Sequence, residues 1–163
     1  MTRQLFLIRH AEAEMGNFEL KDIDRTLTPD GEVVASKVGN KLSELLGRPD
    51  AVLCSSAIRT RQTAVLIAEQ LNFNPERIIF KDELYEASTR ILLHEINKLE
   101  ESWKKVVIVA HNPGIPYLAE YISGDILVGV SPAGVVELSY EGDWAEISEK
   151  TMDLIQYQTP PIA

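Results

Sequence analysis

Short apolar runs alternate with stretches of helical periodicity along this chain, and this alternation constrains the fold more than any other feature. The runs that we expect to form strands are residues 4–8, 51–54, 77–80, 106–110 and 135–140, with a candidate edge strand at 144–149. Three of these runs are rich in Val and Ile without polar alternation, which is typical of strands that helices cover on both faces. They predict an open sheet at the centre of the molecule.

The stretches between the runs have the features of amphipathic helices. Thr28 can cap a helix that has Pro29 at its first position and ends before Gly47. Further helices are expected at about 57–71, on the stripe formed by Leu92, Ile96 and Leu99, and after Pro116. Strands that alternate with such helices predict one domain, residues 1–163, with a three-layer α/β/α architecture and a mainly parallel central sheet.

The charge and hydropathy of the chain exclude several classes of partner. Lys and Arg number 16 and Asp and Glu number 25, so the formal net charge of −9 would repel nucleic acid and anionic membranes. No apolar run approaches the roughly 20 residues of a membrane span, and the run at 5–8 is too short for a secretory signal. The single cysteine, Cys54, allows no internal disulfide. We therefore expect a cytoplasmic protein without nucleic-acid or membrane partners.

Residues that can bind an anion follow several of the expected strands. Arg9 and His10 follow the first strand, Arg59 lies in the first turn of the helix after the second, and His111 follows the run VVIVA. Binding sites in open α/β sheets lie outside the carboxyl ends of the strands. Each residue alone is explained by an ordinary polar strand end, but together these cationic and imidazole groups repel each other unless an anion holds them. The sequence therefore predicts an anion site at this edge.

Two other chemistries fit the sequence less well. His94 lies off the apolar stripe of its helix, and three histidines without ligand spacing beside one cysteine argue against structural zinc, so no metal and no cofactor is expected. Cysteine-dependent phosphatases need a longer phosphate-binding loop than the four residues that separate Cys54 from Arg59. Cys54 is better explained as a small buried strand residue.

Three segments resemble the motifs of the histidine phosphatase superfamily. RHA at 9–11 is similar to the superfamily's Arg-His-(Gly/Ala) turn after the first strand, with Ala in place of the commoner Gly. SSAIRTRQTA at 55–64 resembles the second motif, in which the arginine at the position of Arg59 binds phosphate. HN at 111–112 matches the second catalytic histidine and its neighbour. The resemblance implies a phosphoglycerate mutase-like fold and phosphoryl chemistry.

Within the superfamily, the chain is most similar to the SixA-type phosphohistidine phosphatases. The similarity rests on the short length, on RTLT at 25–28 with Gly31 further on, and on HNPG at 111–114. It covers nearly the whole chain, from about residue 5 to residue 140.

The resemblance implies a role for each matched residue. His10 would attack phosphorus and form a transient phosphohistidine enzyme, while Arg9 and Arg59 would bind the equatorial phosphoryl oxygens. His111, if protonated, would add a third charged donor, and Asn112 beside it is also expected to bind substrate. Positioning and electrostatics would then supply most of the rate.

Two further roles stay open. Arg25 is the SixA-type addition to the phosphate site, unless it forms a surface ion pair with Asp22 or Asp24. In many members a Glu after the third strand protonates the leaving group. The best match here is Glu86, and the alternatives are Glu83, Asp82 or no residue at all.

The first choice of function is hydrolysis of phosphohistidine on a partner protein, such as a phosphotransfer domain. Short connections leave the pocket open to a protein surface, although the 11–27 connection exceeds the usual loop range and could be a partial lid or contain a short helix. The alternatives are a small-molecule phosphomonoester phosphatase of the same superfamily and a phosphate-binding interaction module without catalysis. The sequence predicts no oligomeric state.

Overall fold

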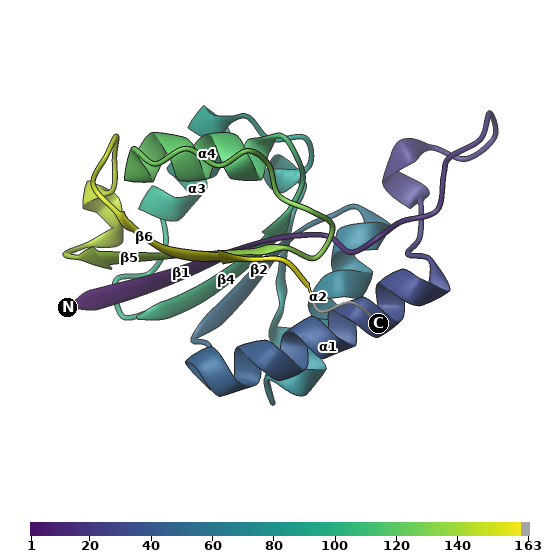
Figure 1. Cartoon of the computed structure of the whole chain (residues 1–163), viewed down its shortest axis with the longest axis horizontal. Helices are drawn as coiled ribbons and strands as arrows, with labels where there is room; N and C mark the ends of the chain where they lie inside the picture. The colour runs from purple at the N-terminus through teal and green to yellow at the C-terminus, as the bar shows by residue number, and fades with distance from the viewer. Residues whose placement is uncertain (161–163) are drawn as a thin grey trace.

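A six-stranded sheet forms the middle layer of the molecule, which the computed structural model describes for residues 1–160 (Figure 1). Its strands, in spatial order, are β3 (Ile79–Lys81), β2 (Ala51–Ser55), β4 (Lys105–Ala110), β1 (Thr2–Arg9), β5 (Val135–Glu141) and β6 (Asp153–Gln158). The first four pair in parallel, whereas β5 runs antiparallel to both β1 and β6. The three-layer prediction is confirmed, and the sheet is mixed rather than mainly parallel.

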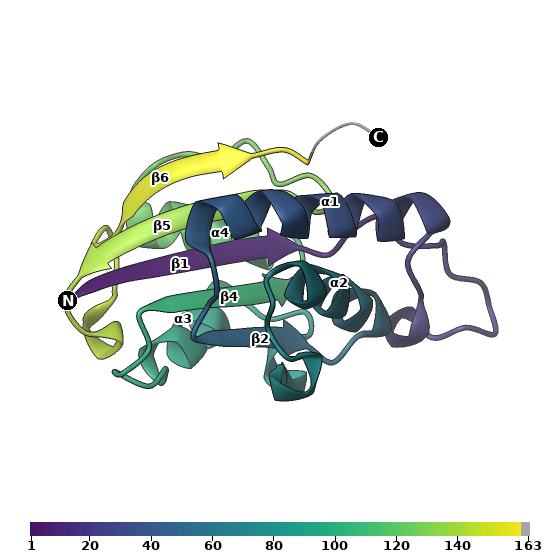
Figure 2. The same cartoon turned by 90° about the horizontal axis from the view of Figure 1, so that it is seen from below.

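Four α-helices cover the two faces of the sheet. Helices α1 (Pro29–Leu46) and α2 (Ile58–Gln70) lie on one face, and α3 (Thr89–Asn97) and α4 (Gly114–Ser123) lie on the other (Figure 2). Successive residues of β1 point into different cores: Phe6 packs with the α1 and α2 residues, and Leu7 packs with those of α3 and α4. This double burial explains why the central strands lack polar alternation.

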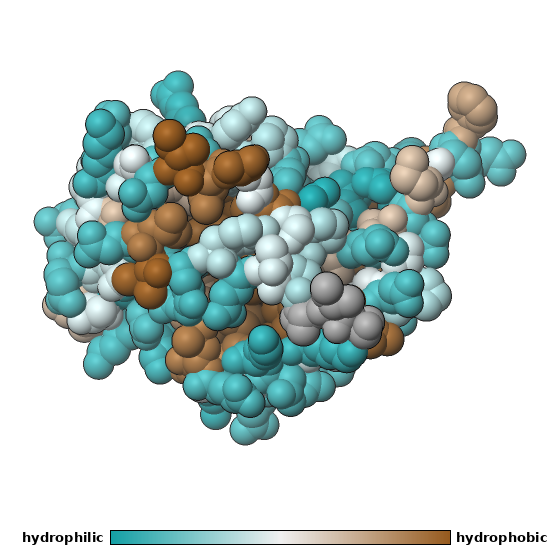
Figure 3. Space-filling view, viewed as in Figure 1, coloured by the Kyte–Doolittle hydropathy of each residue, from teal (hydrophilic) through white to brown (hydrophobic). Residues whose placement is uncertain are grey.

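The reversed direction of β5 follows from the path of the chain after β4. Helix α4 leaves the carboxyl edge of the sheet, and residues 124–134 then bring the chain back across α4 to that same edge (Figure 1). Strand β5 therefore begins where β1 ends, and Gly134 accepts a hydrogen bond from the Arg9 N–H at 3.2 Å. Hydrophobic residues gather over α4 and the chain after it (Figure 3), a segment in which Ile126 and Val128 are exposed.

Two strand predictions need correction. The edge strand expected at 144–149 is wrong, because Trp144–Glu146 forms a 3₁₀ turn whose Trp144 ring is buried and donates to the Trp103 carbonyl at 2.8 Å. The edge strand on this side of the sheet is β6, which sequence reasoning missed because the strand is rich in polar residues. The strand expected at 77–80 begins later, because Pro75–Arg77 forms a 3₁₀ turn and β3 follows it.

The first turn of α1 packs against the segment that follows β1. Thr28 caps the helix, as the sequence predicts, by accepting a hydrogen bond from the Gly31 N–H at 2.9 Å. A Cβ atom on Gly31 would lie 2.2 Å from the Glu12 carbonyl oxygen, so only glycine allows this contact. Among residues 1–160, no helix combines the length and apolar character needed to cross a membrane.

The cap gives a stability prediction. Replacing Thr28 by Ala leaves the Gly31 N–H without its partner, so we expect the free energy of unfolding to fall by about 1 kcal/mol in urea denaturation. Thr26→Ala, an exposed substitution of the same kind two residues earlier, is the control and should change it by less than about 0.5 kcal/mol. Equal losses in the two variants would contradict the capping role.

Candidate active site

The register of β1 and β4 brings the two site histidines together. Arg9 lies opposite Ala110 in the parallel pair, so His10 and His111 leave the sheet side by side. The His10 N–H donates to the Ala110 carbonyl at 3.2 Å, and the two imidazole centroids are 5.5 Å apart. Two residues that are far apart in the sequence thus face one cavity.

His10 is held as a neutral imidazole with a defined tautomer. Its Nδ1 lies 2.7 Å from the Ala11 carbonyl oxygen, and since a carbonyl can only accept, Nδ1 carries the proton and Nε2 carries the lone pair. Burial lowers the pKa of His10 to about 4, with further lowering by the charges of Arg59 and Arg9, although the Ala11 hydrogen bond acts in the opposite direction. At neutral pH the ring therefore presents an unprotonated Nε2.

His111 is also neutral. Burial lowers its pKa to about 3, and the nearby Arg59 lowers it further. The Arg59 Nη2 lies 3.5 Å from Nδ1 of His111, and a guanidinium can only donate, so Nε2 of His111 donates to the Ser55 hydroxyl at 2.7 Å. The charged His111 donor expected from the sequence therefore requires a bound anion to raise this pKa.

Helix α2 carries Arg59 into the site and also fixes the segment after His10. Arg59 is buried in the first turn of α2, and the Thr63 hydroxyl one turn later accepts from the Ala11 N–H at 3.0 Å while donating to the Arg59 carbonyl at 2.8 Å. One helical turn therefore holds both the expected phosphate ligand and the backbone that orients the nucleophile.

The arginines retain donors for an anion. Arg9 uses Nη1 to bind the Val130 carbonyl at 3.1 Å. Among the described residues, the buried Nε atoms of Arg9 and Arg59 have no hydrogen-bond partner. Buried donors without partners are costly, and an oxyanion would satisfy them.

A cavity of about 360 Å³ lies between these groups. Seven of the residues proposed for the site from the sequence line it: Arg9, His10, Arg25, Arg59, Glu86, His111 and Asn112. The other two proton-donor candidates, Glu83 and Asp82, do not line it. The geometry therefore favours Glu86, which reaches the cavity from a left-handed backbone position at φ 51°.

The ion pair considered for Arg25 is present, and the side chain also reaches the cavity. Its Nε donates to the Asp22 carboxylate at 3.0 Å, and its side chain also lines the cavity. Asp22 lies on a 3₁₀ turn (Asp22–Asp24) inside the 11–27 connection, which thus contains the short helix considered from the sequence.

Sequence reasoning missed the part that Asp22, Tyr85 and Ser55 play in the site. Asp22 lines the cavity and accepts a hydrogen bond from the Tyr85 hydroxyl at 2.6 Å, and Ser55 orients His111. Ser55 opens the second motif and Tyr85 precedes Glu86, so their neighbours in the sequence were the signal, although it did not predict the contact of Tyr85 with Asp22.

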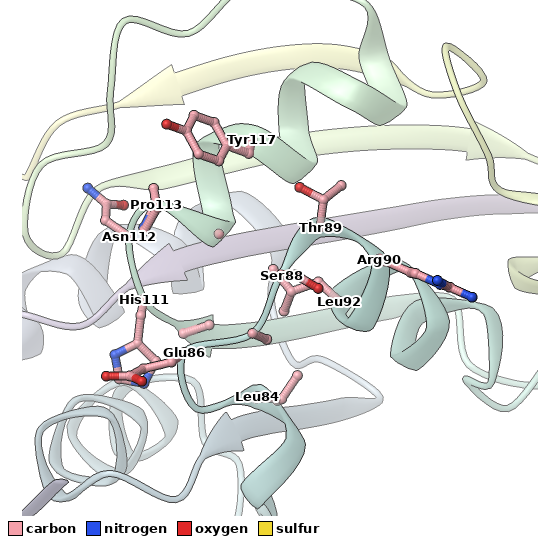
Figure 4. A pocket seen from close by; sticks show the side chains of 13 residues that line it. Leu84, Glu86, Ser88, Thr89, Arg90, Leu92, His111, Asn112, Pro113 and Tyr117 are labelled. Atoms are coloured by element: carbon pink, nitrogen blue, oxygen red, sulfur yellow. The ribbon is translucent and has the colours of Figure 1, made fainter.

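A second cavity of about 570 Å³ adjoins the first between the starts of α3 and α4 (Figure 4). Glu86, His111 and Asn112 line both cavities, whereas His10 lines only the first. Figure 4 shows Glu86 and His111 at one end of the second cavity and Tyr117 at the other. A group attached to a phosphoryl in the first cavity therefore has room beyond Glu86 and His111, in the second.

Cys54 does not serve as a nucleophile. The side chain is fully buried in β2, and burial raises the pKa of its thiol to about 12. Within residues 1–160, no group of three or more His, Cys, Asp or Glu side chains is arranged to hold a metal ion.

Comparisons with known proteins point to the same family as the motifs. The model of the histidine phosphatase superfamily (branch 1) matches residues 5–92. Uncharacterized protein Rv1276c of Mycobacterium tuberculosis strain H37Rv is 31% identical over 163 residues, which cover 94% of this chain and 99% of that protein. Serine/threonine-protein phosphatase PGAM5 of Xenopus tropicalis is 24% identical, and the match covers 72% of this chain and 50% of that protein.

Solved structures agree over almost the whole chain. A Nakamurella multipartitia protein assigned as the phosphohistidine phosphatase SixA superimposes with a TM-score of 0.86 at 28% identity, covering 98% of this chain and 97% of that one. Mycobacterial glucosyl-3-phosphoglycerate phosphatase Rv2419c has a TM-score of 0.71 at 18% identity, covering 98% and 100%. The second likeness shows a shared fold only.

The lowered histidine pKa values predict how stability depends on pH. His10 and His111 have pKa values of about 4 and 3 in the folded chain against 6.5 normally, so the unfolded chain binds more protons between these values. The free energy of unfolding should therefore fall as pH decreases from 6.5 to 4.5, by up to about 1.4 kcal/mol per pH unit for each histidine. Urea denaturation at several pH values measures this slope.

The matched variant is His10→Gln, which removes one of the two titrating groups. Its slope between pH 6.5 and 4.5 should be shallower than that of the wild type. Parallel slopes would show that His10 titrates alike in the folded and unfolded chains.

Proposed function

Since this chain belongs to the histidine phosphatase superfamily, we propose that it removes phosphoryl groups by passing them through His10 to water. The observation that carries the proposal is the fixed Nδ1–H tautomer of His10, which leaves Nε2 free toward a cavity lined by three arginines. A nucleophile needs an available lone pair, and the Ala11 hydrogen bond together with burial provides it at neutral pH.

The reaction takes two displacements at phosphorus. Nε2 of His10 forms the first N–P bond while the bond from phosphorus to the leaving group breaks, and Glu86 gives its proton to the departing atom. Water then attacks the phosphohistidine, Glu86 takes the water proton, and the N–P bond breaks to return His10 and release phosphate. Arg9, Arg25 and Arg59 bind the phosphoryl oxygens throughout.

The position of the second cavity supports this assignment of roles. In-line displacement places the leaving group opposite the nucleophile. Glu86 lines both cavities and His10 only the first, so a leaving group that extends into the second cavity lies beside the proposed proton donor. A bound dianion would also raise the pKa of His111, which then becomes a charged donor at the transition state.

We favour phosphohistidine on a protein as the substrate. The 11–27 connection, whose base lines the cavity, projects from the body of the molecule (Figure 1) and exposes Met15 and Phe18 almost completely. Exposed apolar side chains beside a pocket suit contact with another protein. The likeness to the Nakamurella SixA protein supports the same choice, and the acidic exterior would narrow the set of partners.

A small phosphate ester remains the second candidate because Glu86 lines the cavity. Alkyl esters need a proton donor for the leaving oxygen more than phosphoramidates do. The glucosyl-3-phosphoglycerate phosphatase with the same fold acts on such an ester. A non-catalytic phosphate-binding module is the least supported, since such a module gains nothing from a tautomer-locked His10.

The substrate assignment is tested by turnover of a phosphotransfer domain that carries phosphohistidine, beside a panel of small phosphate esters. His10→Ala should lower phosphate release by about a thousandfold or more, because the nucleophile is lost. The control is His94→Ala, an exposed histidine that does not line the cavity. Normal turnover in His10→Ala would end the proposal, and rapid turnover of one ester alone would favour the small-molecule function.

Glu86 gives a second, separate prediction. Glu86→Gln removes the proton donor of the first displacement, so the rate of phosphoenzyme formation should fall by about 10²- to 10⁴-fold for an alkyl phosphate and by less than about tenfold for phosphoramidate. Hydrolysis of the phosphoenzyme, which is common to both substrates, should slow equally. Glu83→Gln makes the same charge change outside the cavity and serves as control. Equal losses in the rate of phosphoenzyme formation from the two substrates would show that Glu86 does not act as the acid.

A further inference from the structure

A carboxylate of the chain itself already occupies part of the phosphate cavity. Asp22 lines this cavity from the 11–27 connection. Its side chain accepts hydrogen bonds from Arg59 Nη2 at 3.0 Å, Arg25 Nε at 3.0 Å and the Tyr85 hydroxyl at 2.6 Å. Its backbone carbonyl accepts from Arg59 Nη1 at 2.7 Å. Two of the arginines that line the cavity are thus engaged by one aspartate.

The contacts of Asp22 resemble those that a bound anion would receive. A carboxylate and a phosphoryl group are both oxyanions and prefer the same guanidinium geometry. The Tyr85 hydrogen bond lowers the pKa of Asp22 to about 2, and Arg59 adds to this, so the side chain stays ionised at any physiological pH.

Asp22 is the exposed partner of its ion pair with Arg59. Its side chain is 47% exposed, whereas that of Arg59 is only 5% exposed. Asp22 and Arg25 belong to a connection, and outside it the hydrogen-bond partners of the carboxylate among residues 1–160 are Arg59 and Tyr85. Asp22 therefore balances the buried charge of Arg59, a role that an oxyanion in the cavity could also fill.

We propose that Asp22 is a built-in competitor that lowers the affinity of the site for free phosphate. A phosphate ion must share Arg25 and Arg59 with this carboxylate, against the repulsion between two negative groups. A phosphoryl group on a larger substrate gains further contacts beyond the phosphate cavity, so it can overcome the same repulsion. Asp22 thus weakens the binding of product phosphate and speeds its release, while contacts beyond the phosphate cavity keep the substrate bound.

If Asp22 instead served to position the arginines, its removal would change the phosphate affinity in the opposite direction. If the carboxylate served mainly to hold Arg59 and Arg25 in place, its removal would leave both side chains free to move, and phosphate would bind more weakly. If it competes with phosphate, its removal tightens binding. The sign of one change in affinity therefore separates the two roles.

The test is calorimetric titration of the whole protein with inorganic phosphate at pH 7. Asp22→Asn and Asp22→Ala should bind phosphate about tenfold more tightly than the wild type, because a repelling charge leaves the cavity. Asp24→Asn is the matched control: it makes the same charge change in the same 3₁₀ turn, and Asp24 does not line the cavity. Its affinity should stay within about twofold of the wild type.

Unfolding curves of each variant check that the native fold is kept. The proposal would be overturned if the folded Asp22 variants bound phosphate as weakly as Asp24→Asn or more weakly. Equally tighter phosphate binding in all three variants would overturn it too. The inference rests on the proposed function, since it takes Arg25 and Arg59 as phosphoryl ligands. Because the titration needs no turnover, its outcome can be read even if the protein proves not to be a phosphatase.

Discussion

Parallel pairing of β1 with β4 is the constraint on which the site depends. Arg9 pairs with Ala110, so β1 and β4 end at the same level and His10 and His111 leave the sheet together. A slip of one residue would turn the side chains of β1 to the wrong faces and bury the wrong residues in the two cores. The same hydrophobic pattern that specifies the sheet register therefore specifies the distance between the two histidines.

Electrostatics then determines what this edge can do. Burial and the arginines keep both histidines neutral, and the Ala11 carbonyl selects the proton position on His10. The remaining positive charge is partly balanced by Asp22, and the buried Nε donors of Arg9 and Arg59 are left for a ligand. The site is thus ready for an oxyanion, while the internal carboxylate keeps it from holding one too tightly.

The sequence predicted the parts of the site that lie directly beside strong local signals. His10 and His111 follow apolar strands, and Arg59 lies one helical turn after the next strand, so the order of elements was enough to bring them together. Asp22 and Tyr85 could not be placed in this way, because their contact joins a long connection to a distant turn. Strand β6 was missed for a related reason: an edge strand needs few apolar residues, so hydropathy did not mark it.

The central claim is that phosphoryl transfer passes through Nε2 of His10. The most direct measurement is to quench the reaction within milliseconds under alkaline conditions and locate the phosphoryl group by ³¹P NMR and peptide mass spectrometry. The account predicts a phosphohistidine at His10 that carries the phosphoryl on Nε2, since Nδ1 is engaged by the Ala11 carbonyl. A phosphoryl group on Nδ1 or on another residue, or turnover without any covalent intermediate, would contradict it.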